Sequence, residues 1–215
     1  MALVEPAIWI ELLKAVPGVI TAITAVAGVT IASRGLNRWH VETLGKRKAE
    51  LAEQALIAAY EARDVFKWVR TGAFLDGEGN TRQSAADESE HERRQRNVYF
   101  VPIERLTRDK ELFARLQTLQ YPFAAYFGEP MRGPFLALRE IHVLLVSAAS
   151  MLIHITHGDK RQQGYEHSFA PLLNDLGWGA SRPDDTDRKI DKAVADLEAV
   201  CRPVLMAKGE RGSAQ

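Results

Sequence analysis

Two pairs of residues have types and spacings that could hold a metal ion. Glu88 and His91 form a Glu-x-x-His motif, which supplies two ligands from one helix face in carboxylate-bridged di-metal bundles. Such a site needs the motif on two helices with further glutamates facing it, and this chain has it once. His154 and His157 lie three apart near the end of a predicted helix, but no carboxylate accompanies them at a matching spacing. We therefore predict no metal site, a half-buried His154 and a His157 that interacts with the helix C-terminus.

The single cysteine, Cys201, could act as a nucleophile because Arg202 beside it can lower a thiol pKa. Cys201 also falls on the apolar face of a predicted helix, which favours a buried structural thiol. The motifs of a nucleophile elbow and of a phosphate-binding loop are absent. We predict no catalytic residue and no cofactor, and the sequence favours a non-enzymatic protein.

Another group of polar side chains could bind a small anion. Several of them share one predicted helix, and the segment after this helix could fold back to bring a further arginine towards them. The candidate polar binding cluster consists of Tyr60, Arg63, Asp64, Arg70, Arg82 and His157. The interpretation that we favour for these residues is a structural salt-bridge network that ties the loop to the helix.

The composition excludes several classes of protein. The 215 residues carry 28 basic and 28 acidic side chains, so the chain is not a uniformly basic nucleic-acid binder. Hydrophobic residues make up 46% of the chain, which is enough for a sizeable core. The basic run Lys46-Arg47-Lys48 has acidic neighbours one helical turn away at Glu42 and Glu50, and it is typical of a solvated helix face. We expect no nucleic-acid partner.

The N-terminal part of the chain contains a stretch without charged side chains. Residues 15–33 contain no ionisable side chain over 19 residues, close to the roughly 20 that a helix needs to cross a bilayer. Lys14 is the only basic side chain before the stretch, whereas five follow it by residue 48. The positive-inside rule then places the N-terminus outside and the C-terminal part in the cytoplasm. Arg34, Arg38 and Trp39 are the predicted membrane-interface residues.

Two other interpretations of this stretch stay open. Ala25-Val26-Ala27 has the form of a signal-peptide cleavage site, although the preceding residues lack a net positive charge. The glycines and threonines dilute the apolar residues, so a helix buried in a soluble core is the second alternative. Small residues at Gly18, Ala22, Ala25 and Ala32 could let two spans approach closely, but such residues are simply common in spans.

The rest of the chain shows apolar residues at three- and four-residue steps, which predicts amphipathic helices. The first helix ends at Gly72 and has Leu44, Leu51, Ala55, Ala58, Ala62, Phe66 and Val69 on one face. The second runs from Val98 to Gly128, with Ile103, Leu106, Phe113, Leu116, Leu119, Phe123 and Tyr126 inward and Pro102 in its first turn. The third runs to Gly158 with Phe135, Leu138, Ile141, Leu145, Ala148, Leu152 and Ile155.

The last predicted helix follows the N-cap candidates Asp184, Asp185 and Thr186, and Pro203 should kink or shorten it. Its inward residues are Ile190, Val194, Leu197, Cys201 and Leu205. No strand-like alternation appears, so we predict an all-α chain with one N-terminal transmembrane helix followed by an up-and-down four-helix bundle.

The predicted organisation has three parts. Residues 1–35 form the membrane-anchoring segment, residues 36–207 the cytoplasmic bundle and residues 208–215 a frayed tail. Within the bundle, the charged segment 72–97 is expected to be a mobile, solvated loop. The loop at 158–183 carries enough aromatic and leucine side chains to pack back on the bundle.

Part of the chain resembles a known kind of protein. The residues that carry the resemblance are Ile31-Ala32, Leu36, Trp39, Gly45-Lys46-Arg47-Lys48, Glu50-Leu51-Ala52-Glu53, Tyr60-Glu61-Ala62-Arg63-Asp64 and Gly79-Asn80-Thr81-Arg82. This GKRKAELAE-like stretch is similar to uncharacterised bacterial proteins with a single inner-membrane span and a cytoplasmic helical region. The resemblance covers about the first half of the chain, implies a bacterial inner membrane and supplies no activity.

Three functions are compatible with these patterns. The leading hypothesis is a membrane-anchored, non-enzymatic interaction, scaffold or sensing protein, held in the bilayer by residues 15–33, whose bundle binds a protein partner or a second copy. The first alternative is a ligand-binding or enzymatic bundle with a pocket under the loop at 158–183. The second is a soluble all-α protein with a buried first helix.

Overall fold

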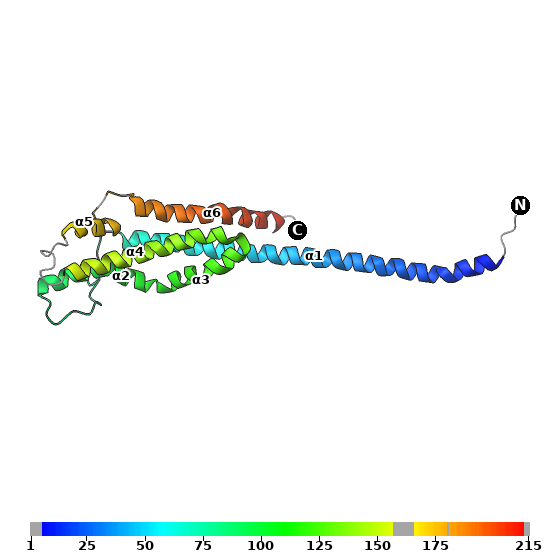
Figure 1. Ribbon diagram of the computed structural model, residues 1–215, viewed down its shortest axis with the longest axis horizontal. Helices are drawn as coiled ribbons and strands as arrows, with labels where there is room; N and C mark the ends of the chain where they lie inside the picture. The colour runs from blue at the N-terminus through cyan, green and yellow to red at the C-terminus, as the bar shows by residue number, and fades with distance from the viewer. Residues whose placement is uncertain (1–5, 157–165, 180, 213–215) are drawn as a thin grey trace. The chain divides into compact units, whose positions relative to one another are not determined.

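The chain is all-α. The computed structural model describes residues 6–156, 166–179 and 181–212, and this part of the chain contains helices and no strand. In chain order the elements are α1 (Pro6–Val69), α2 (Glu90–Arg108), α3 (Lys110–Phe127), the 3₁₀ helix η1 (Glu129–Arg132), α4 (Gly133–Ile155), α5 (Glu166–Asp175) and α6 (Asp185–Gly212). Figure 1 labels the helices α1 to α6.

The chain divides into two compact units, Met1–Arg47 and Lys48–Gln215, which we call unit 1 and unit 2. In unit 2, α1 contributes a face of alanines and larger apolar residues to the core. The buried members of the predicted stripe are Leu51, Ala55, Ala58, Ala62, Phe66 and Val69, whereas Leu44, in unit 1, is 39% exposed. α1 ends at Val69, and Gly72 is not among the described glycines with positive φ, so it is not a left-handed cap.

α2 begins eight residues earlier than the helix predicted from Val98, inside the segment expected to be a loop. The hydroxyl of Ser89 accepts a hydrogen bond from the Glu92 backbone N–H, and the Glu92 carboxylate accepts one from the Ser89 N–H. This capping box gives a polar sequence a defined helix start. Pro102 therefore lies in the middle of α2 and not in its first turn.

The predicted second helix is in fact two helices, α2 and α3, separated at Asp109. The apolar stripe continues across the break because both helices contribute to one core. Leu106, Leu116, Leu119 and Phe123 are buried, while Ile103, Phe113 and Tyr126 pack against the core from partly buried positions. Periodicity alone did not indicate the break.

α4 is the central helix of unit 2. It contacts α2, α5 and α6, and all seven residues of its predicted stripe are buried, which confirms that prediction. Among the residues whose side chains the structure describes, which leave out most of 6–31, one segment, Glu129–Ile155, is long and apolar enough to cross a membrane, with a mean hydropathy of 1.7. A third of its most apolar window, 33%, is buried inside the structure, and the buried stripe supplies that part.

The predicted loop at 158–183 contains a helix, α5, whose side chains pack on the core. Phe169 and Leu176 are buried, and Leu172, Leu173 and Trp178 are partly buried against the same cluster. α6 runs beside α4 (Figure 1). Its inward residues are as predicted, with Leu205 only partly buried. Contrary to expectation, α6 continues through Pro203 to Gly212, so the described part of the predicted frayed tail is helical.

Candidate functional site

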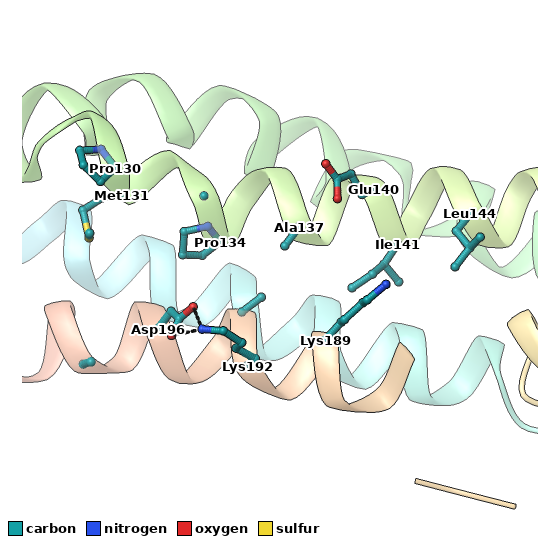
Figure 2. A pocket seen from close by; sticks show the side chains of 13 residues that line it. Pro130, Met131, Pro134, Ala137, Glu140, Ile141, Leu144, Lys189, Lys192 and Asp196 are labelled. Atoms are coloured by element: carbon teal, nitrogen blue, oxygen red, sulfur yellow. Dashed lines mark hydrogen bonds and ion pairs between the residues drawn. The ribbon is translucent and has the colours of Figure 1, made fainter. Parts of the chain in front are cut away.

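An apolar groove of about 690 Å³ lies between α6 and the segment formed by η1 and α4 (Figure 2). Its apolar lining is Met131, Pro134, Ala137, Ile141 and Leu144 on one side and Ala193 and Ala199 on the other. The small side chains of the three alanines leave space between the two helices. The volume falls within the range of about 300 to 1,000 Å³ that is typical of ligand sites.

Charged side chains stand on both sides of the groove. Glu140 belongs to α4, and Lys189, Lys192 and Asp196 belong to α6. The Lys192 ammonium is paired with the Asp196 carboxylate at 2.7 Å, the contact that is dashed in Figure 2. Lys189 extends from α6 towards the side of the groove formed by α4 (Figure 2). An occupant would therefore meet an apolar floor, the acidic Glu140 on one rim, and Lys189 beside the Lys192–Asp196 ion pair on the other.

A second polar site surrounds Arg70, whose side chain is fully buried. Its two terminal nitrogens donate to the carboxylates of Asp187 and Asp184, and its Nε donates to the Asp175 carbonyl at 3.2 Å. Arg182 adds two hydrogen bonds to Asp187, at 2.6 and 2.9 Å. These bonds, led by those from Arg182, lower the pKa of Asp187 to about 2.

The same aspartates also cap α6. The Asp187 N–H donates to the Asp184 carboxylate at 2.9 Å, and the Asp184 N–H donates to Asp187 at 3.2 Å. This reciprocal arrangement is a capping box built from two aspartates. Gly177, with φ of +77°, lies so close that a Cβ there would be 3.1 Å from the Arg70 carbonyl oxygen. The site is thus a tightly packed junction of α1, α6 and the segment after α5.

Arg105 organises the segment after α1. Its guanidinium binds Glu78 with two hydrogen bonds, donates to the carbonyls of Trp68 and Ala73 at 2.8 Å and lies 4.0 Å from the centre of the Trp68 ring. The side chains of Arg105 and Glu78 are 1% and 7% exposed. A buried arginine with this many partners fixes the path of the chain around it.

A further pair of arginines encloses Glu88. Arg82 binds both Glu88 carboxylate oxygens, at 2.7 and 2.8 Å, and Arg96 binds one of them. The Glu88 side chain is 1% exposed. The expectation of a solvated connection at 72–97 does not hold for Glu78 and Glu88, because Arg105, Arg82 and Arg96 give these two carboxylates buried partners. The Glu88 carboxylate is engaged by these two arginines, and His91 is exposed.

The residues of the predicted polar binding cluster lie in different places. Tyr60 donates to the Glu198 carboxylate, and the Arg63 guanidinium lies over the Tyr60 ring at 5.2 Å and 3.6 Å from Asp64. Arg70 and Arg82 belong to the two separate networks above. His157 lies outside the described residues, as does the part of the loop at 158–183 that runs from 158 to 165. Of the described members, Tyr60, Arg63, Asp64, Arg70 and Arg82 are not among the residues that line the groove between α4 and α6.

Other predicted residues are placed as follows. Arg34 and Arg38 are exposed and Trp39 is 63% exposed. Cys201 is buried, as predicted, and burial raises the pKa of its thiol to about 11. His154 is exposed rather than half-buried. Across the described ranges, no group of three or more His, Cys, Asp or Glu side chains is placed to hold a metal ion.

The buried networks were only partly visible in the sequence. Asp184 was recognised as an N-cap candidate, and the Asp-x-x-Asp spacing to Asp187 was a further signal of a capping box. Ser89-x-x-Glu92 was a similar signal for the start of α2. Nothing local marks Arg105 or Glu78, because their pairing depends on how the chain returns after α1.

No protein-family model matches the sequence, no curated protein is similar to it, and no solved structure matches its fold. Function is therefore argued from the geometry of the chain itself.

Proposed function

We propose that this protein is a membrane-anchored, non-enzymatic interaction protein whose unit 2 binds a helical segment of a partner protein. In this proposal one span at residues 15–33 precedes an up-and-down bundle built from the C-terminal part of α1, the pair α2 and α3, α4 and α6. The setting is a bacterial inner membrane, with the N-terminus outside and unit 2 in the cytoplasm.

The proposed membrane anchor is supported by the charge-free stretch 15–33, which exposed cations follow directly. Arg34 and Arg38 stand at the level where headgroup phosphates would lie, and Trp39 adds an interfacial aromatic. Exposed apolar side chains beside them, such as Val29 at 70% and Leu36 at 66%, are costly in water and ordinary against lipid.

The groove between α4 and α6 supports the partner-binding part of the proposal. An amphipathic helix can lay its apolar face between two helices, which is a common mode of recognition. The rim charges specify its polar edges: an acidic side chain would face Lys189, and a basic side chain would face Glu140. We propose no reaction, because the candidate polar residues Tyr60, Arg70 and Arg82 are engaged in internal contacts.

Topology is tested by labelling whole cells that express the full chain. Ala2→Cys and Ser213→Cys variants are treated with a membrane-impermeant maleimide, with the wild type as the control because Cys201 is buried. The proposal predicts that the label reaches position 2 and not position 213 until the cells are opened. Labelling of both positions, or of position 213 alone, in intact cells would contradict the proposed orientation.

Groove occupancy is tested with a photo-crosslinking amino acid at Ala137, inside the groove, and at Val143, on α4 but outside the groove lining. The proposal predicts one discrete adduct from position 137, identified by mass spectrometry as a polypeptide with an amphipathic helical segment. Lys189→Glu should weaken this adduct by reversing a rim charge. The same adducts from both positions, a lipid adduct, or none would contradict the proposal.

A further inference from the structure

The groove between α4 and α6 has two ends that differ in charge. Figure 2 shows Pro134 of α4 across from Asp196 of α6, and we call this the proximal end. Towards Leu144, which marks the distal end, Ile141 of α4 lies across from Lys189 of α6, so the two helices run antiparallel. Between the two ends α4 rises by about 15 Å, which is the length of about three helical turns.

The distal end carries two opposite charges on opposite rims. Glu140 stands on the α4 rim at the level of Lys189 on the α6 rim (Figure 2). Both side chains are exposed, and within the described part of the chain neither forms an ion pair. The charge of Lys189 acts on the Asp175 carboxylate without an ion pair between them. At the proximal end, by contrast, Lys192 and Asp196 neutralise each other at 2.7 Å.

These two charges restrict what the groove can bind. A purely anionic ligand would be repelled by Glu140, and a purely cationic one by Lys189. An amphipathic helix can satisfy both, because the polar side chains on the two flanks of its apolar face point towards opposite rims. An acidic side chain on one flank would pair with Lys189, and a basic side chain at the same level on the other flank would pair with Glu140.

The direction of such a helix matters because the groove is not symmetric. If the helix were turned end for end with its apolar face still on the floor, both charged side chains would move to the proximal end. Each flank would also face the opposite rim. At the proximal end the helix would meet Lys192 and Asp196, which already pair with each other. The reversed complex would therefore lack both distal ion pairs and gain none in return.

We propose that Glu140 and Lys189 set the direction in which the partner helix lies in the groove. This inference rests on the proposed function and adds the chemistry of the partner. The partner segment is an amphipathic helix of about three turns, with an acidic and a basic side chain on opposite flanks near one end. Glu140 and Lys189 then distinguish a helix with this pattern from one in which the two charges are exchanged.

The test is photo-crosslinking of the full chain in the cells that express it. The photo-crosslinking amino acid replaces Met131, near the proximal end, or Leu144, at the distal end. Tandem mass spectrometry of each adduct locates the attached residue on the partner helix. We expect adducts from position 131 at one end of the partner helix and adducts from position 144 at the other end, always in the same order. Adducts at both ends of the partner helix from each position would overturn the proposal.

An exchange of the two rim charges tests their role directly. Glu140→Lys combined with Lys189→Glu should lower the yield of adducts in the original order at least about fivefold, because both distal contacts become repulsive. The matched control is Lys192→Glu combined with Asp196→Lys, which keeps an ion pair at the proximal end and should change this yield by less than about twofold. All four side chains are exposed, so neither exchange should unfold unit 2.

The outcomes separate this inference from the proposed function. The original order at an unchanged yield after the distal exchange, or an equal loss in the proximal control, would overturn the role of Glu140 and Lys189 while leaving the groove as a binding site. No polypeptide adduct from position 131 or position 144 in the otherwise unchanged chain would overturn the proposed function and this inference together.

Discussion

Two regions of this chain reverse the usual relation between polarity and burial. Between residues 29 and 44, apolar side chains such as Leu36 and Trp39 are exposed. Between residues 70 and 105, charged side chains such as Glu88 and Arg105 are buried. Internal arginines supply the partners that allow the carboxylates to be buried. In the proposed function, the apolar side chains of unit 1 would instead lie against a bilayer.

We expect the largest effect on stability from the loss of the Arg105 side chain. Arg105→Ala should lower the free energy of unfolding by about 3 to 5 kcal/mol, because it leaves Glu78 buried without its cation. The matched control is Arg94→Ala, whose partner Glu90 is exposed, and which should cost less than about 0.5 kcal/mol. Urea denaturation followed by circular dichroism measures both. Similar losses in the two variants would mean that the charged segment is not a buried network.

A second test asks whether the segment after α1 is fixed in one path. Gly79 has φ of +81°, and a Cβ there would lie 2.0 Å from the Asn97 carbonyl oxygen. Gly79→Ala should therefore cost about 2 to 3 kcal/mol of unfolding free energy. In Gly72→Ala a Cβ meets nothing within 4 Å, so the change should be within about 0.5 kcal/mol. A mobile loop would tolerate both substitutions equally.

The pH dependence of stability tests the aspartates that hold Arg70. Because the pKa of Asp187 is lowered from 3.8 to about 2, its contribution to stability is complete above pH 3.8 and is lost as the pH falls through this interval. The difference in unfolding free energy between the wild type and Asp187→Asn should shrink by about 2 kcal/mol from pH 6 to pH 2. Asp185→Asn, at an exposed position, should show no such change. If the difference in unfolding free energy between the wild type and Asp187→Asn did not change with pH, Asp187 would not be held by a buried ion pair.

The smallest expected effect lies in the apolar region. Leu36→Ala should leave the unfolding free energy of unit 2 within about 0.5 kcal/mol of the wild type, because Leu36 is 66% exposed. Leu51→Ala, on the buried row of the same helix, is the reference for what a core leucine contributes. If Leu36→Ala destabilised unit 2 as much as Leu51→Ala, the side chain of Leu36 would have to be covered by the chain itself.

The sequence predicted the helical class and the buried faces of the longer helices, since three- and four-residue apolar spacing depends only on local geometry. The stripe of α4 is an example, with all seven residues buried. It did not predict the ordered segment around Glu88, because a run of mixed charges with few apolar residues does not show that Arg82 and Arg96 will enclose this carboxylate. It also grouped Tyr60 with Arg82, which the structure separates, since proximity along the chain says little about long-range pairing.

The sequence also did not predict the groove between α4 and α6. In the sequence, Ala137 and Ala193 are ordinary small residues of amphipathic helices. They line a groove only because of the way in which α4 and α6 pack. A pocket under the segment 158–183 was expected because aromatic residues are concentrated there. Phe169 and Leu176 are instead used to complete the core.

We propose that the exposed apolar residues of unit 1 belong to a segment held in a bilayer. Extraction of membranes with alkaline carbonate tests it directly, because this treatment releases peripheral proteins and leaves spanning ones in the pellet. We expect the full chain to stay in the pellet after extraction and to be released by detergent. Recovery of the chain in the carbonate supernatant, or in the soluble fraction before extraction, would contradict it.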